Sequence, residues 1–311
     1  MPVTSPWLRR ILLTNLVLQV LIVVTGGLVR LTGSGLGCPT WPRCEEGSFT
    51  PVVHDALTFH PFIEFGNRLL SMVVGAVALL AVWAVWRWAR DRRPMLGLAL
   101  GILGITIGQG VLGGVTVLTG LHPTTVMAHF LVSMTLIALS TALLLREREP
   151  DTPAVALVPR IVRQLGLATG VVLVVVLVLG TVVTGSGPHS GDADEPARFG
   201  FDPRTISWLH ADAVMLFVGL VVAMVVATSL LSGAARSRGW WGAVMLISLA
   251  QGVVGYTQYL TGLPEALVLV HMLGAAALTI GVTGGLLTLW ERPLVSATAE
   301  PLGEDDAALR S

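Results

Sequence analysis

Residues 109–121 read QGVLGGVTVLTGL, and residues 251–263 read QGVVGYTQYLTGL. Eight of these thirteen positions are identical without a gap, at an offset of 142 residues. The same offset places His129 on His271. A second short motif, Thr-Gly-Ser-Gly at 32–35, recurs at 184–187. Self-similarity of this kind predicts a chain built from two related halves, which we place at 1–150 and 151–295.

The composition is that of a membrane protein. Of the 311 residues, 53% are hydrophobic and only 12% are charged, with a mean hydropathy of +0.78. A soluble domain carries roughly 25% charged residues, and a disordered chain has few apolar ones. Two cysteines are too few for a disulfide scaffold or an iron–sulfur protein. Zero net charge argues against nucleic acid as a partner.

Eight apolar segments are long enough to cross a bilayer, which takes about 20 helical residues. We therefore predict an all-α membrane protein with eight transmembrane helices in two tandem four-helix bundles. Each half has an even number of spans, so the pseudo-twofold repeat is parallel. The predicted spans are Ile11–Val29, Leu69–Trp86, Met95–Leu118, Thr125–Leu145, Leu165–Val183, Ile206–Leu231, Trp240–Leu260 and Leu267–Leu289.

The arginines predict the orientation, because cytoplasmic loops are enriched in positive charge. Fourteen arginines fall on one side of the predicted spans and five on the other. We expect a cell-membrane protein with both termini in the cytoplasm and the long loops 31–65 and 184–205 outside. Residues 296–311 are acidic and are predicted to form a disordered cytoplasmic tail.

Three histidines lie inside the predicted spans: His129, His210 and His271. Ionisable groups within a membrane are costly and usually functional. The sixth and eighth spans are diagonal in an up-down-up-down bundle, so His210 and His271 can face one central object. A haem with two axial imidazoles fits this arrangement better than zinc, which takes four ligands. The alternative is a set of core histidines hydrogen-bonded to polar neighbours.

The N-terminal half departs from this pattern. An offset of 143 places Asn67 on His210, and an amide is a poor iron ligand. A haem held by His129 would keep an open or weakly held position, which suits oxygen activation or a haem that must be exchanged. His60, two helical turns before Asn67, is an alternative ligand, although a role at the end of the loop is favoured.

Other polar residues cluster near the outer interface. Glu64 can handle protons beside a haem edge, or it can be an acid that the helix dipole favours. Arg30 and Arg68 can bind propionates by bidentate pairing, or they can extend to lipid headgroups. Cys38 and Cys44 lie in an outer loop, where a disulfide is favoured and a redox-active thiol pair is the alternative. Gln109 and Gln251 are expected to form interhelical hydrogen bonds.

Together these residues resemble the heme A synthase family, membrane enzymes that oxidise haem O to haem A. The resemblance runs along all eight spans. It rests on the sequence GGLVRLTGSGLGC at 26–38, on Glu64-x-x-Asn67-Arg68, on Gly-Pro-His-Ser-Gly at 187–191, and on the three membrane histidines. Two features depart from the family pattern. The pattern is usually Glu-x-x-His where this chain has Asn67, and some relatives carry a second cysteine pair in the third outer loop (187–205 here), which this chain lacks.

The resemblance implies a function and a set of site residues. His210 and His271 would hold a haem b cofactor, and the N-terminal half would take haem O through His129, with Asn67 nearby and Glu64 essential to the chemistry. The implied reaction hydroxylates one ring methyl successively to the formyl group, for cytochrome c oxidase biogenesis. Expected partners are haem O, the lipid bilayer, haem O synthase, an electron donor that the sequence does not identify, and a second copy of the chain.

Two other functions compete with this one. A dihaem b-type electron-transfer protein without oxygenase activity explains the histidines, but it leaves Asn67 and Glu64 unexplained. A repeat-built transporter fits the two halves, but the spans lack paired Gly/Pro interruptions at corresponding positions near the midplane.

Overall fold

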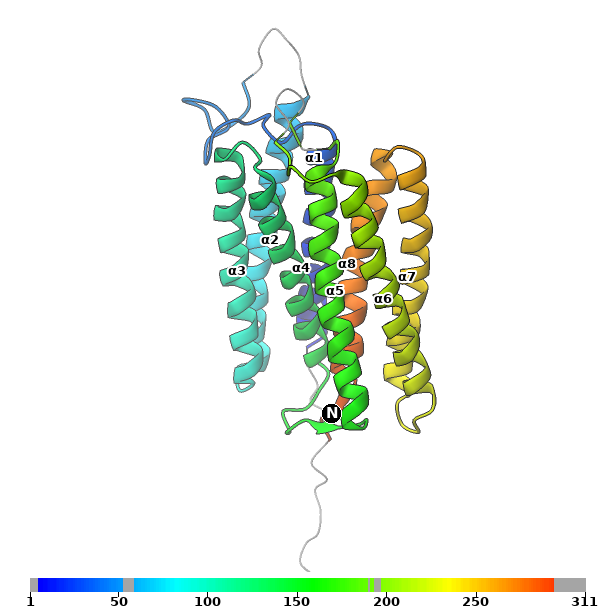
Figure 1. Cartoon of the computed structure of the whole chain (residues 1–311). Helices are drawn as coiled ribbons and strands as arrows, with labels where there is room; N and C mark the ends of the chain where they lie inside the picture. Colours follow the sequence, from blue (N-terminus) through cyan, green and yellow to red (C-terminus); the bar gives the residue numbers. More distant parts are fainter. Residues whose placement is uncertain (1–4, 53–58, 190, 193–196, 294–311) are drawn as a thin grey trace, which may run out of the picture.

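The computed structural model describes residues 5–52, 59–189, 191–192 and 197–293. Its eight long helices confirm the all-α membrane fold (Figure 1), and all eight are long and apolar enough to cross a membrane. Their bounds are α1 Pro6–Leu31, α2 His60–Ala89, α3 Arg93–Leu118, α4 Pro123–Arg146, α5 Arg160–Ser186, α6 Pro203–Ser229, α7 Ala235–Leu260 and α8 Glu265–Leu287. Two short strands, β1 Val155–Ala156 and β2 Trp290–Glu291, pair antiparallel.

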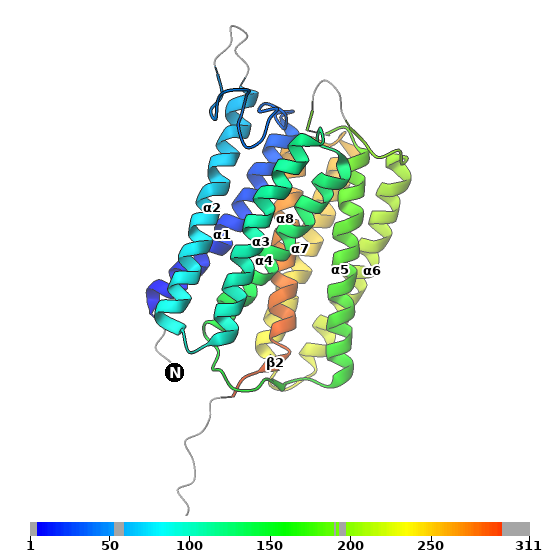
Figure 2. The ribbon, with the colours of Figure 1, turned by 90° about the vertical axis from the view of Figure 1, so that its left-hand side faces the viewer.

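The helices pack as two rings of four, which lie next to each other in Figures 1 and 2. In the first ring α1 contacts α2, α2 contacts α3, α3 contacts α4, and α4 closes onto α1. In the second ring α5 to α8 repeat the same order of contacts. Helices α2 and α4 are therefore diagonal, as are α6 and α8, which is the arrangement that the site prediction requires.

Each ring has its own apolar core. One cluster of buried side chains joins α1 to α4, with Leu12, Val85 and Ile137 among its members. A second joins α5 to α8 around Phe217 and Trp241. The rings meet along α1, α4, α5 and α8. Small residues permit close approach there: a Cβ on Gly27 of α1 would stand 2.7 Å from the Met272 side chain of α8.

The repeated sequence also has a repeated local structure. Each copy ends in a turn in which a glycine and a leucine both have positive φ: Gly120 at 62° and Leu121 at 55°, then Gly262 at 80° and Leu263 at 62°. The leucine N–H donates to the carbonyl of the fifth preceding residue in both turns, at 2.9 Å and 2.7 Å. A left-handed leucine is uncommon, so its recurrence marks the two copies as structurally equivalent at this turn.

Most predicted boundaries differ from the helix ends by two to five residues, and the start of α2 differs by nine. Helix α2 begins at His60, nine residues before the expected Leu69. Its first turns are polar, and they remain helical because they pack against the outer loop. Thr184 to Ser186 belong to the last turn of α5, whereas the first copy of this motif follows α1. The predicted tail at 296–311 lies outside the described residues.

The chain enters α1 and leaves β2 at the same end of the bundle, opposite the loop at 32–52 (Figure 1). At that opposite end Asp202 caps α6, because its carboxylate accepts hydrogen bonds from the Thr205 hydroxyl at 2.6 Å and backbone N–H at 2.9 Å. These bonds hold the pKa of Asp202 below its usual range. The cap fixes the start of the helix that carries His210.

Candidate functional site

Glu64 is buried at the outer end of α2, with 5% of its surface exposed. Its Oε2 accepts the backbone N–H of Cys38 at 2.7 Å, and its Oε1 accepts the Nε and Nη2 of Arg68 at 3.0 Å and 2.5 Å. Cys38 is bonded to Cys44, which confirms the disulfide. The carboxylate is thus held between its own helix and a closed, covalently bridged loop.

Arg68 is fully engaged within the protein. Besides Glu64, its guanidinium donates to the carbonyls of Cys38 at 2.8 Å, Thr40 at 3.0 Å and Arg43 at 3.1 Å. A guanidinium has five N–H groups, and these five hydrogen bonds use all of them. The expectation that Arg68 binds a propionate is therefore not supported, because no donor remains. Its observed contacts fix the disulfide loop and orient Glu64.

Arg30 occupies the boundary between the two rings. Its Nη2 donates to the carbonyl of Thr184 on α5 at 2.9 Å, while its Nε is buried and lacks a partner among the described residues. Gly191 of the outer loop packs on its side chain. Arg30 is thus the arginine of the predicted pair that retains a free donor.

Asn67 lies one turn further along α2 than Glu64. Its Oδ1 accepts a hydrogen bond from the Thr25 hydroxyl at 2.8 Å, and its amide nitrogen faces Gly26 of α1. His60, the alternative ligand, hydrogen-bonds Ser34 through Nδ1 at 2.8 Å. That contact ties His60 to the outer loop, which agrees with the role favoured for it.

His129 lies on α4, diagonal to Asn67, and its backbone is clamped from α3. Gln109 Nε2 donates to the His129 carbonyl at 2.8 Å and to the Ser133 hydroxyl at 2.6 Å. The imidazole packs against Gly113, where a Cβ would stand 3.3 Å from its Cε1. The hydrogen bond fixes the position of α4 along its axis relative to α3, and Gly113 leaves room for the imidazole of His129.

His271 has the same surroundings on α8. Gln251 Nε2 donates to its carbonyl at 2.8 Å, and Gly255 faces its Cε1 at a Cβ distance of 3.5 Å. These bonds confirm the interhelical role expected for both glutamines. His210 on α6 packs in turn against Gly180 of α5. His210 and His271 thus lie on the diagonal helices α6 and α8.

The three membrane histidines share a feature that suits iron ligation. In each of them Nδ1 is buried and has no hydrogen-bond partner among the described residues. Buried polar atoms are nearly always satisfied, so an unpartnered Nδ1 in each of three imidazoles that face a glycine indicates a missing partner. His210 is the least open of the three, because its imidazole also interacts with the backbone of Val176 on α5. A haem between diagonal helices provides iron for the rings and an apolar face for the surrounding side chains.

Sequence reasoning missed several of these contacts. Gly113 and Gly255 are the fifth residues of the two repeated motifs, so their recurrence was a usable signal. Thr25, Ser133 and Gly180 carry no such signal, because their role depends on which helix faces which.

The comparisons with known proteins identify the family of the chain. Residues 9–189 match the family model COX15-CtaA, described as cytochrome oxidase assembly protein. This match covers more than half of the chain, and the chain belongs to that family.

Curated relatives point the same way. The chain is 34% identical over 139 residues to a heme A synthase of Geobacillus thermodenitrificans, which is 44% of this chain and 42% of the relative. It is 33% identical over 141 residues to that of Halalkalibacterium halodurans, covering 44% and 46%. For Shewanella oneidensis the identity is 32% over 155 residues, covering 46% and 45%. The matches thus span less than half the length of each relative.

Proposed function

We propose that this chain oxidises a ring methyl of haem O to the formyl group of haem A by successive hydroxylations, in support of cytochrome c oxidase assembly. The observation that carries the proposal is that the described residues include three membrane histidines with a buried, unpartnered Nδ1 and one buried carboxylate held by an arginine and the disulfide loop. The names of the relatives and the family description support it.

The second ring would hold the resident cofactor. His210 and His271 lie on diagonal helices and would bind a haem b, which supplies one-electron transfer when bound. Gln251 sets the height of His271 through its carbonyl. Gly180 and Gly255 leave room for the imidazoles of His210 and His271 beside the neighbouring helices.

The first ring would receive the substrate. His129 would bind the iron of haem O. Asn67 is at the diagonal position, where its Oδ1 accepts a hydrogen bond from Thr25. The buried Nε of Arg30 has no partner among the described residues and would donate to a propionate. Glu64 would hold or release a proton at a carboxylate oxygen, and the disulfide loop and Arg68 keep that carboxylate in place.

The membrane orientation is part of the proposal. The arginine distribution favours a cytoplasmic location for both termini, and Glu64 and the disulfide would then lie at the outer face. Haem O would enter from the bilayer, and haem O synthase and an electron donor are the protein partners that this function requires.

The test is to express the full chain in a host that makes haem O but lacks a heme A synthase. Extracted haems are separated by chromatography with mass detection. We expect haem A or its alcohol precursor, absent from cells with an empty vector and from the Glu64→Gln variant. Unchanged haem O beside a protein that has bound haem b would instead support the electron-transfer alternative.

A further inference from the structure

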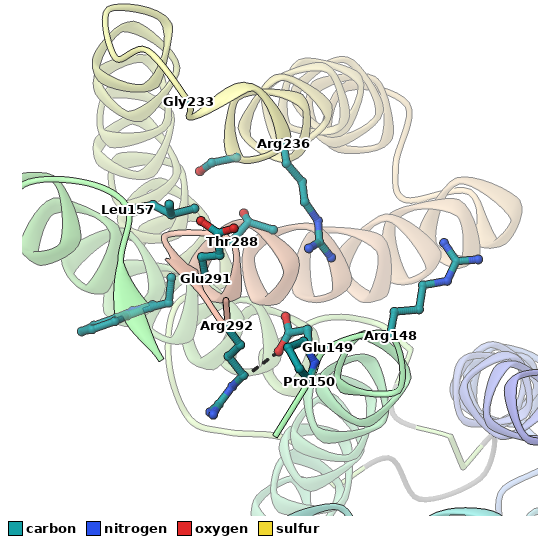
Figure 3. A pocket seen from close by; sticks show the side chains of 11 residues that line it. Arg148, Glu149, Pro150, Leu157, Gly233, Arg236, Thr288, Glu291 and Arg292 are labelled. Atoms are coloured by element: carbon teal, nitrogen blue, oxygen red, sulfur yellow. Dashed lines mark ion pairs between the residues drawn. The ribbon is translucent and has the colours of Figure 1, made fainter. Parts of the chain in front are cut away.

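A cavity of about 330 Å³ lies at the end of the bundle opposite the disulfide loop. It is open on one side and is lined by the segment after α4, the start of α7 and the segment around the end of α8 (Figure 3). Its volume is at the lower end of the range for small-molecule sites. The lining residues that matter here are Arg148, Leu157, Arg236, Ser237, Trp290 and Glu291.

One side of this cavity is positively charged. Arg148 and Arg236 are exposed, and within the described part of the chain neither guanidinium forms a hydrogen bond or an ion pair. Helix α7 begins here at Ala235 without a capping side chain. The first N–H groups of a helix have no intrahelical acceptor, and they favour an anion.

Ser237 gives a second, independent sign of a ligand. It lines the cavity, is 1% exposed, and its hydroxyl lacks a partner among the described residues. An unsatisfied buried hydroxyl is costly, and a phosphate oxygen held by the two arginines would accept its hydrogen bond.

The other side of the cavity offers a negative charge. Glu291 on β2 is exposed, and its carboxylate has no ion-pair partner among the residues that the structure describes. Figure 3 shows it beside Thr288, which ends α8. The carbonyl end of a helix adds negative potential there. Glu149 does not contribute free charge, because it pairs with Arg146 at 3.0 Å and with Arg292 at 3.7 Å.

A ligand that satisfies both sides carries a phosphate and an amine. We propose that this cavity binds a phosphoethanolamine group, with the phosphate at Arg148, Arg236 and Ser237 and the ammonium at Glu291. Trp290 of β2 and Leu157 on its rim are 44% and 40% exposed, and tryptophan is enriched at the membrane interface. The group can come from a phosphatidylethanolamine headgroup or from a soluble phosphoethanolamine. The proposal is independent of the haem chemistry.

The test uses the full chain, delipidated in detergent, and measures lipid binding by native mass spectrometry. Phosphatidylethanolamine should bind about tenfold more tightly than phosphatidylcholine, whose methylated amine donates no N–H bond, and than phosphatidylglycerol, which has no amine. The Glu291→Gln variant should lose this preference and keep binding to the phosphate. Arg236→Gln should weaken the binding of all three lipids, and Arg148→Gln provides the same test at a second position.

Matched controls are Arg238→Gln, which removes an exposed arginine of α7 outside the cavity, and Glu265→Gln at the opposite end of α8. Both should bind lipid as the unaltered chain does. Competition by soluble phosphoethanolamine would identify the headgroup as sufficient, whereas binding of the lipid alone would identify the membrane as the source. Equal binding of the three lipids, or a preference that survives both Glu291→Gln and Arg236→Gln, would overturn the proposal.

Discussion

The two rings differ most at their second helices, α2 and α6. The offset that places Asn67 on His210 also places Glu64 on Ser207 and Arg68 on Ala211. On α2 these positions form an ion pair fastened to a disulfide loop. On α6 the Ser207 hydroxyl merely donates to the Pro203 carbonyl of its own helix at 2.7 Å. The first ring thus has a charged, rigid cluster where the second has only an imidazole.

The fourth helices of the two rings, α4 and α8, are instead alike. Both carry a histidine whose carbonyl accepts a glutamine amide at 2.8 Å, beside a glycine of the preceding helix. A common scaffold with one altered helix therefore separates the two proposed tasks. One ring would retain a cofactor through two imidazoles, and the other would act on a substrate held by one.

Glu64 is where we expect the largest effect. The Glu64→Gln variant keeps an oxygen to accept the Cys38 N–H but loses the proton-handling carboxylate, so conversion of haem O should fall by about 100-fold or more. The ratio of haem A to haem O in extracts measures this. Glu46→Gln, an exposed acid of the same outer loop, is the control and should convert normally. Conversion by Glu64→Gln at the unaltered rate would remove Glu64 from the chemistry.

The histidines give the next largest contrast. His271→Ala should lower the haem b content of the purified protein roughly tenfold or more, since it removes a proposed iron ligand of the second ring. His129→Ala should leave that haem in place and lose only the substrate haem. Pyridine haemochrome spectra of protein purified without haem O measure the haem b content, and spectra of protein purified with haem O measure the substrate haem. Equal haem b in His271→Ala and the unaltered chain would refute the assignment of a resident cofactor to the second ring.

A third test concerns the ion pair that only the first ring has. Arg68→Ala leaves the buried Glu64 without its counter-charge and should lower the free energy of unfolding by about 3–5 kcal/mol. The Glu64→Gln, Arg68→Ala double variant should recover part of this loss, because the uncompensated charge is then gone. Denaturant unfolding in detergent provides the measurement. Additive losses in the double variant would mean that the loop bonds of Arg68, and not its pairing with Glu64, dominate.

The sequence predicted what depends on hydrophobicity and repetition. All eight spans, the diagonal arrangement and the Cys38–Cys44 bond agree with the structure. The sequence did not predict that α2 starts at His60, because a hydropathy profile places the end of a span at charged residues such as Glu64 and Arg68. Their charges are instead neutralised by each other and by loop carbonyls.

The role of Arg68 shows the same limit of sequence reasoning. An arginine near a proposed haem site has the right chemistry for propionates. Whether its five N–H groups are free depends on how residues 38–43 fold over it, and that is a tertiary property. Arg30 meets the same chemical criterion, and its Nε has no partner in the part of the chain that the structure describes. Residue type alone could not separate the two arginines.

The smallest effect should come from the glycines that face the histidine rings. A Cβ at position 255 would stand 3.5 Å from His271 Cε1, which is ordinary contact, whereas one at 180 would stand 3.2 Å from His210 Cε1. Alanine stabilises a helix by up to about 1 kcal/mol over glycine, and overpacking costs about the same or more. Gly255→Ala should therefore raise the melting temperature slightly and leave the haem spectrum unchanged. Gly180→Ala should not raise the melting temperature, and it should shift the haem spectrum. A shift of the same size in both variants would show that the two imidazoles are equally confined, contrary to the closer packing on α5.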